Sequence, residues 1–265
     1  MLCCGLFRST AVLRSLPLTT CTVIVMAGSF AASSFAQSEA KPNASPYARK
    51  NSFGILTAYS NDSSHMFLGY AENRKLLDIG ASYSRRLYLN HVMSWQYDGE
   101  ILPVALNSDP VQLTTSTVSF TNPPLTFTST IDTPTVMACH PDSGSGTLGP
   151  NGPTFSFVST CHRRWVVGEG ISPIGMQWNF LPRRKLQPIV EGHGGYMYST
   201  RTIPVERGGS FNFTFDVGVG FELYRSHAHS YRVEYRYHHI SNDETANANP
   251  GIDSGVFQFS WLFGR

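Results

Sequence analysis

The strongest pattern in the sequence is a strict alternation of apolar and polar side chains near its C-terminal end. In residues 211–223 every second residue is apolar and mostly aromatic or β-branched, while Asn, Thr, Asp, Gly and Glu lie between them. Residues 231–238 alternate Tyr and Val with Arg, Glu and His, and residues 257–263 alternate Phe and Trp with Gln, Ser and Leu. A period of two is that of a β-strand, and no helix would keep these two sets apart. The pattern predicts strands with one apolar and one polar face.

Eight segments of the chain have the pattern and length of strands. They are residues 52–70 with a break expected near Asn61, 75–87, 91–106, 164–181, 185–199, 210–224, 230–241 and 252–263. A soluble sandwich also alternates, with its apolar face in the core. A membrane barrel is favoured because the apolar faces are aromatic toward their ends and the polar faces carry rows of charges that can pair inside. We therefore predict an all-β fold, an eight-stranded antiparallel transmembrane β-barrel of the outer-membrane type.

A long segment rich in Ser, Thr, Pro and Gly, at about 107–163, follows the third predicted strand. With the N-terminus in the periplasm, this connection and those after the fifth and seventh strands are external, whereas Asn90, 182–184 and 225–229 form tight inner turns. We expect 107–163 to be an external loop that forms a lid or exposed flap of the barrel domain, 52–265, and not a second domain.

Residues 1–36 are predicted to be a cleaved signal peptide. Arg8 and Arg14 precede an apolar run, and small residues flank a cleavage site at Ala36. An uncleaved anchor helix is the alternative, but a proline and many Ser and Thr residues disfavour it. The mature chain would then begin with a short N-terminal segment, 37–51.

Two cysteines, Cys139 and Cys161, remain after the signal peptide is removed. An even number in an exported chain predicts a disulfide. His140 and His162 follow them, so a Cys/His metal site is the alternative, although adjacent side chains seldom both reach one ion. We expect the disulfide, with neither a metal nor a cofactor.

Charged residues make up only 14% of the chain, and the formal net charge is +2. This deficit excludes a disordered chain, and the balance of charge argues against nucleic acid as a partner. Few charges and 12% aromatic residues suit strands that face lipid.

Candidate chemistry lies in one of the alternating strands. His239 and Ser241 are two residues apart, on the face that also carries Val233 and Tyr235, and therefore point toward lipid. Asp253 opens the next predicted strand, which is antiparallel, so it can come to lie beside His239. An imidazole that takes the serine proton, oriented by a carboxylate, is the chemistry of a serine esterase. Interfacial His and Ser residues of an aromatic girdle are the alternative interpretation.

Three motifs add a family resemblance. The sequence reads FNFTFD at 211–216, YRYHHISN at 235–242 and NPGIDS at 249–254. Over 192–263 it resembles the lipid A 3-O-deacylase family, the PagL-like acyloxyacyl hydrolases of Gram-negative outer membranes. Members are eight-stranded barrels that hydrolyse the ester-linked acyl chain at the 3-position of lipid A.

The resemblance implies a role for each matching residue. Ser241 would be the nucleophile, His239 the general base and Asp253 the orienting acid, and Asn242 would contribute to the oxyanion site. The best-known member of the family has Glu at the acid position, and Asp is one methylene shorter. Glu244, in the following loop, is therefore kept as an alternative acid.

The sequence thus predicts a lipid A 3-O-deacylase in the bacterial outer membrane, with its active site on the outer-leaflet side. Its partners would be the lipopolysaccharide substrate, outer-membrane lipids and, in a homodimer, a second copy of the chain. Two other functions fit the sequence: a non-catalytic small barrel that serves as an anchor or adhesin, and an outer-membrane phospholipase with the same triad.

Overall fold

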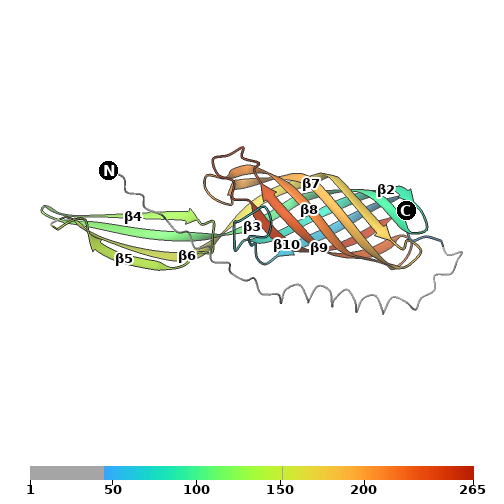
Figure 1. Cartoon of the computed structure of the whole chain (residues 1–265), viewed down its shortest axis with the longest axis horizontal. Coiled ribbons are helices and arrows are strands. Elements are labelled where there is room, and N and C mark those ends of the chain that lie inside the picture. Colours follow the sequence, from blue (N-terminus) through green and yellow to red (C-terminus); the bar gives the residue numbers. More distant parts are fainter. Residues whose placement is uncertain (1–44, 151) are drawn as a thin grey trace, which may run out of the picture. The chain divides into compact units, whose positions relative to one another are not determined.

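The computed structural model describes residues 45–150 and 152–265, and ten strands make up its regular structure (Figure 1). They are β1 (Asn51–Ser60), β2 (Lys75–Leu89), β3 (Met93–Thr121), β4 (Pro124–Pro134), β5 (Asp142–Thr147), β6 (Thr154–Phe180), β7 (Leu186–Ile203), β8 (Gly209–Tyr224), β9 (His229–Ser241) and β10 (Ile252–Gly264). No helix within these described ranges is long and apolar enough to cross a membrane. The predicted signal peptide, 1–36, lies outside the described residues.

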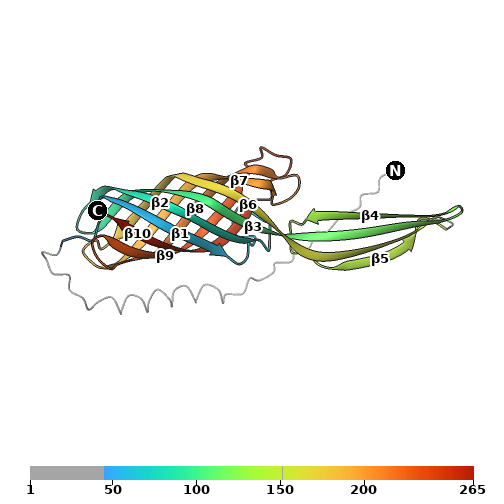
Figure 2. The same cartoon turned by 180° about the vertical axis from the view of Figure 1, so that it is seen from behind.

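Eight of the strands close into an antiparallel ring. The order is β1, β2, β3, β6, β7, β8, β9 and β10, and β10 pairs with β1 again (Figures 1 and 2). Each of the eight predicted segments corresponds to one strand of this ring. The first predicted strand ends at Ser60, where the break was expected, and residues 61–74 form a separate connection.

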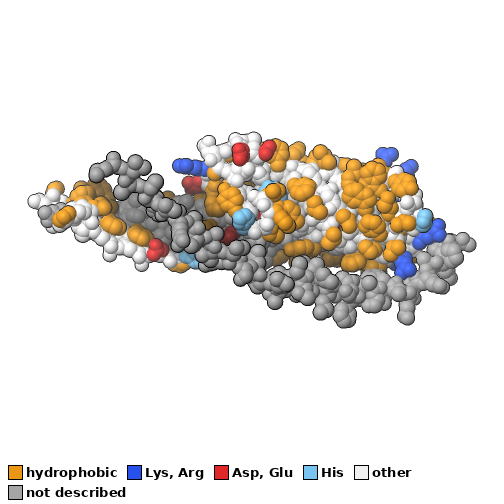
Figure 3. All heavy atoms as spheres, viewed as in Figure 1, with side chains coloured by type: hydrophobic (Ala, Val, Ile, Leu, Met, Phe, Trp, Pro, Cys, Tyr) orange, Lys and Arg blue, Asp and Glu red, His pale blue; other side chains and the backbone are white. Residues whose placement is uncertain are grey.

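The alternation sorts side chains between the two faces of the wall. On β8, Phe211, Phe215 and Leu223 are exposed, whereas Asp216 and Glu222 between them are buried. The same holds for β9 and β10, and Figure 3 shows apolar side chains over much of the visible barrel surface. An apolar exterior around a polar interior is the inverse of a soluble protein and suits a wall immersed in lipid. The predicted eight-stranded barrel of the outer-membrane type is confirmed.

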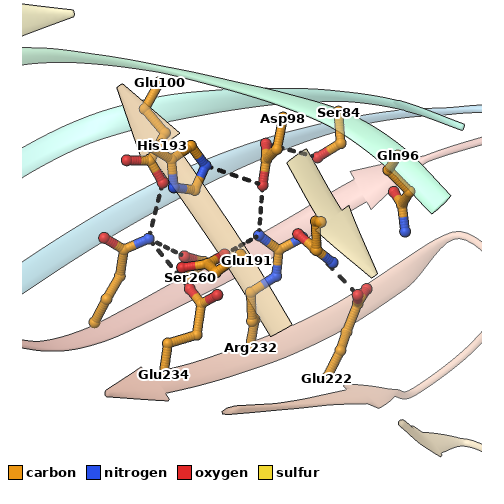
Figure 4. Close-up of polar contacts among 12 residues, drawn as sticks. Ser84, Gln96, Asp98, Glu100, Glu191, His193, Glu222, Arg232, Glu234 and Ser260 are labelled. Carbon is orange, nitrogen blue, oxygen red and sulfur yellow. Dashed lines mark hydrogen bonds and ion pairs between the residues drawn. The ribbon is translucent and has the colours of Figure 1, made fainter. Parts of the chain in front are cut away.

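The barrel interior is filled by paired charges (Figure 4). Arg236 donates two hydrogen bonds to Glu100, at 2.8 and 3.0 Å, and Arg232 donates to Asp98 at 2.8 Å. All four side chains are buried. Burial of charge is tolerated here because each carboxylate has a guanidinium partner.

The predicted loop at 107–163 is instead mostly a sheet. β3 and β6 continue past the barrel as a paired ribbon, and β4 and β5 flank them in the order β4, β3, β6, β5. We call this four-stranded sheet the extension. The predicted disulfide is confirmed, since Cys139 and Cys161 are bonded and link the segment after β4 to β6. The Ser and Thr content suggested a loop, but Thr is β-branched and favours strands, which explains the difference.

Candidate active site

The C-terminal end of β9 brings two polar side chains to the outer surface of the barrel. His239 and Ser241 alternate with buried residues and share the face of the exposed Tyr235. On the neighbouring strand, Asp253 is the register partner of His239. Directly opposed residues of an antiparallel pair share a face. The structure therefore groups the three predicted triad residues on the outer side of β9 and β10, at one end of the wall.

The imidazole and the carboxylate are in direct contact. His239 Nδ1 lies 2.7 Å from Asp253 Oδ1, which also accepts a hydrogen bond of 2.8 Å from the Tyr237 hydroxyl. The other oxygen, Oδ2, accepts hydrogen bonds from the main-chain N–H groups of Phe67 and Leu68, at 2.8 and 3.0 Å. Asp253 is fully buried by these contacts. With Nδ1 protonated toward Asp253, Nε2 of the imidazole is the nitrogen that can act as a base.

Ser241 is held by a different set of groups. Asn249 Nδ2 donates to Ser241 Oγ at 3.0 Å, and the main-chain N–H of Asp243 donates to the same oxygen at 3.1 Å. In the part of the chain that the structure describes, no hydrogen bond joins Ser241 to His239. In enzymes without substrate, catalytic hydrogen bonds are often long and tighten only in the complex. The serine hydroxyl in turn donates to Asn249 Oδ1 at 3.2 Å, so Asn249 contacts Ser241 through both polar atoms of its amide group.

Asn242, the predicted oxyanion residue, has a different position. Its side chain is buried, and Nδ2 donates to the carbonyl of Ala248 at 2.8 Å. Its main-chain N–H donates to Asn249 Oδ1 at 3.1 Å. Asn242 therefore shapes the loop that carries Asn249, and Asn249 is the asparagine that contacts Ser241. Sequence reasoning missed this role, although Asn249 opens the Asn-Pro-Gly motif.

Of the two acids considered, only Asp253 contacts His239. Glu244 is exposed in the loop after β9, with a positive φ of 58°. Among the described residues it makes no hydrogen bond or ion pair with the imidazole. The shorter Asp reaches His239 because the β9–β10 register places the two residues directly opposite each other.

A second missed element is the connection between β1 and β2. Its residues 67–71 lie along the start of β10, where the N–H of Tyr70 donates to the carbonyl of Pro250 at 2.9 Å and that of Ala71 to Gly251 at 3.0 Å. The sequence signal was present, because apolar residues in succession interrupt the alternation there. This connection supplies both main-chain donors to Asp253.

The interior holds another cluster with the composition of a metal site (Figure 4). One donor atom each of Asp98, Glu191 and His193 lies within 4.8 Å of the others. Arg232 is 2.8 Å from Asp98 Oδ2, and Arg236 is paired with Glu191. These guanidinium groups already neutralise the two carboxylates, so the cluster belongs to the ion-paired interior.

The C-terminal part of the chain matches the model of a known family. Residues 142–261, a little under half of the chain, match the model of the family described as lipid A 3-O-deacylase (PagL). The expected resemblance to the lipid A 3-O-deacylase family is confirmed. The matched span contains the whole of β6 to β9 and nearly all of β10, with His239, Ser241, Asn249 and Asp253.

The solved structures that match this chain resemble it only distantly in sequence and in backbone geometry. Neisserial surface protein A is 12% identical with a TM-score of 0.39, over 82% of this chain and 97% of its own. OprG from Pseudomonas aeruginosa is 8% identical with a TM-score of 0.37, over 83% and 100%. LpxR from Salmonella typhimurium is 9% identical with a TM-score of 0.24, over 81% and 100%. At such TM-scores these likenesses bear on neither the site nor the activity. No curated protein matches the chain.

Proposed function

We propose that this chain is an outer-membrane esterase that hydrolyses the 3-O-linked acyl chain of lipid A. The observation that carries the proposal is the 2.7 Å contact between His239 and Asp253, with Ser241 on the same outward face of β9. The match of residues 142–261 to the lipid A 3-O-deacylase family supports the substrate class. A serine, an imidazole and a carboxylate on a lipid-facing wall suit an ester that cannot leave the membrane.

In the proposed mechanism Ser241 Oγ attacks the acyl carbonyl carbon while His239 Nε2 takes the serine proton. The tetrahedral intermediate then releases the 3-hydroxyl of the glucosamine, which receives that proton from His239. Water, deprotonated by His239, hydrolyses the acyl-enzyme, releases the fatty acid and restores Ser241. Asp253 holds the imidazole through Nδ1–H and stabilises its charged form in both steps.

The oxyanion is assigned to different donors from the one that the sequence suggested. Asn249 Nδ2 and the N–H of Asp243 already approach Ser241 Oγ, at 3.0 and 3.1 Å. In the proposed mechanism both N–H groups donate to the carbonyl oxygen, which becomes negative beside Oγ when the carbonyl carbon bonds to Oγ. One such donor contributes about 2.7 to 4 kcal/mol to transition-state stabilisation in other enzymes.

An apolar groove on the outer wall supports an acyl substrate. It is lined by Val219, Val233, Tyr235 and Phe257, among others, on β8, β9 and β10. Tyr235 lies four residues before His239 on β9, which corresponds to roughly 13 Å along a strand. An acyl chain whose ester lies at Ser241 can therefore run down the wall into this groove.

The connections at the two ends of the barrel support an outer-leaflet site. The turns at 90–92, 181–185 and 225–228 are short and lie at one end, whereas the extension and the connection 61–74 lie at the end that carries His239. Outer-membrane barrels have short periplasmic turns and longer extracellular connections. The site would then lie at the outer surface, where lipid A is found.

Mass spectrometry of lipid A from cells that produce the chain tests the proposal. Wild type should release the 3-O-linked acyl chain, and Ser241→Ala or His239→Ala should lower the rate at least about 1,000-fold, because triad members act as a unit. His229→Ala, on the same face at the other end of β9, is the matched control and should retain activity. Heat-modifiable migration in gels checks that each barrel is folded.

Three results would contradict the proposal. Full deacylation by Ser241→Ala would remove the assigned nucleophile. Loss of acyl chains from glycerophospholipid with intact lipid A would indicate a phospholipase. No change in either lipid class would favour an anchor or adhesin.

A further inference from the structure

Residues 67–71, here called the acid clamp, hold the carboxylate of Asp253 from the side opposite His239. The clamp donates two main-chain hydrogen bonds to Oδ2, from Phe67 at 2.8 Å and Leu68 at 3.0 Å. Oδ1 is occupied by His239 and by the Tyr237 hydroxyl. With donors on both oxygens, the carboxylate cannot rotate without losing charge-assisted hydrogen bonds, which are among the strongest in proteins.

The clamp lies against β10 at a distance that only glycine permits. A Cβ on Gly69 would lie 2.8 Å from Asp253 N and from the carbonyl carbons of Gly251 and Ile252. No side chain fits between two backbones at that separation. The clamp is therefore placed by main-chain contacts on both sides of Gly69, from Phe67 to Ala71.

The residues after the clamp are fixed by a buried arginine. Arg74 donates hydrogen bonds to the carbonyls of Val136, at 2.6 Å, and Pro204, at 3.1 Å. Its Nε lies 3.5 Å from Asp109 Oδ1. Burial lowers the pKa of Arg74 to about 10, which leaves the guanidinium charged at neutral pH. The clamp is thus tied to the root of the extension and to the connection between β7 and β8.

Phe67 and Leu68 bind the carboxylate of Asp253 through their main-chain N–H groups, and their side chains are largely exposed. Phe67 and Leu68 are 76% and 65% exposed, and the Phe67 ring meets the Tyr237 ring edge-on, with centroids 5.3 Å apart. A change at Leu68 therefore removes a hydrogen bond without opening a cavity. This property makes the main-chain donor testable by substitution.

We propose that Phe67, Leu68 and Tyr237 are positioning residues, which act on the reaction only through Asp253. The N–H groups of Phe67 and Leu68 and the Tyr237 hydroxyl, together with His239, hold Asp253 in place. The best-known member of the family that the sequence resembles has the longer glutamate at this position. The inference rests on the proposed function, because the acid matters only if His239 is the base.

Steady-state kinetics of the full chain, reconstituted in vesicles that contain lipid A, provide the test. Leu68→Pro removes one N–H from Oδ2, and Tyr237→Phe removes the hydroxyl from Oδ1 while keeping the ring. Each should lower kcat about 10-fold to 100-fold and leave KM within about twofold, because a hydrogen bond to a charged group contributes that much. Loss of a contact with only a structural role would not lower kcat while leaving KM unchanged.

Matched controls separate the proposal from general damage. Met66→Pro introduces proline next to the clamp, at an N–H that bonds none of the described residues, and Tyr231→Phe removes a hydroxyl from the same face of β9. Both should keep kcat within about threefold. In an Asp253→Ala background, Leu68→Pro should cause no further loss, because interacting residues are not additive.

Wild-type kcat in both Leu68→Pro and Tyr237→Phe would overturn the inference. So would an equal loss in Met66→Pro, or an additive loss in the Asp253→Ala background. These results differ from failure of the proposed function, in which wild type would leave lipid A intact or Ser241→Ala would remain active.

Discussion

The barrel wall and the extension share two strands, β3 and β6, but use the period of two differently. Inside the barrel, β3 contributes Gln96, Asp98 and Glu100, all buried. Past the barrel, residues 111–162 contain no Lys, Arg or Glu. The ring encloses its polar face, so that face must neutralise its own charges. The extension is a single open sheet, and its polar face needs only hydroxyl groups.

The two faces of the extension also differ, although less sharply than those of the barrel. One face carries paired hydroxyls, such as Thr117 and Thr128 at 3.4 Å and Ser119 and Thr126 at 3.2 Å. The other carries apolar side chains, Phe120, Phe127, Phe155 and Phe157 among them. Apolar and polar side chains therefore alternate on strands of both regions. Whether the polar face is buried depends on closure of the sheet.

The largest effect is expected when the enclosed charges are broken. Arg236→Met removes two hydrogen bonds to Glu100 and the ion pairs with Glu191 and Glu234. The buried carboxylates lose their main counterion, so we expect the free energy of unfolding to fall by about 3–5 kcal/mol. Urea unfolding in vesicles, followed by tryptophan fluorescence, measures this change.

The exposed Arg201 provides the control for this comparison. Arg201→Met should change the free energy of unfolding by less than about 0.5 kcal/mol. A similarly small change in Arg236→Met would mean that water reaches the interior charges and that they do not depend on one another for neutralisation.

The sequence predicts the barrel better than the extension, and the reason is physical. The bounds of β8, β9 and β10 agree with prediction to within one residue, because one face meets lipid and the other is enclosed. In the extension both faces are exposed, so Thr and Ser could occupy either without violating a pattern. Composition then suggested a loop where the strands form.

The site shows a similar division. The positions of His239, Ser241 and Asp253 follow from the strand period and from antiparallel pairing, both of which are local. The acid clamp could not be found in this way, because its donors are main-chain N–H groups that do not depend on side-chain type. They reach Asp253 from 185 and 186 residues away in the sequence. The contact of Asn249 with Ser241 depends on the conformation of the intervening loop.

A smaller effect, confined to the extension, is expected from removal of the disulfide. The bond joins Cys139 to Cys161, which are 22 residues apart. Closing a loop of this size contributes about 3 kcal/mol in the chain-entropy model. Cys139→Ala with Cys161→Ala should speed chymotrypsin cleavage at the phenylalanines of the extension. The urea midpoint of the barrel should not move, and a matching fall in that midpoint would show that the two regions unfold together.

The smallest effect is expected on the hydroxyl face. Thr117 is half-buried and Thr128 is exposed, and Val keeps the β-branched shape of Thr, so Thr117→Val should change local stability by less than about 0.5 kcal/mol. Chymotrypsin cleavage of the extension measures it. Ser84→Ala in the barrel is the comparison, because Ser84 Oγ donates to Asp98 at 3.0 Å in the enclosed interior. In Ser84→Ala the buried carboxylate of Asp98 loses a hydrogen-bond donor where water cannot replace it. The free energy of unfolding should therefore fall by about 1–3 kcal/mol. A loss of that size in Thr117→Val would mean that the hydroxyl face is covered, as an enclosed face is, under the conditions of the assay.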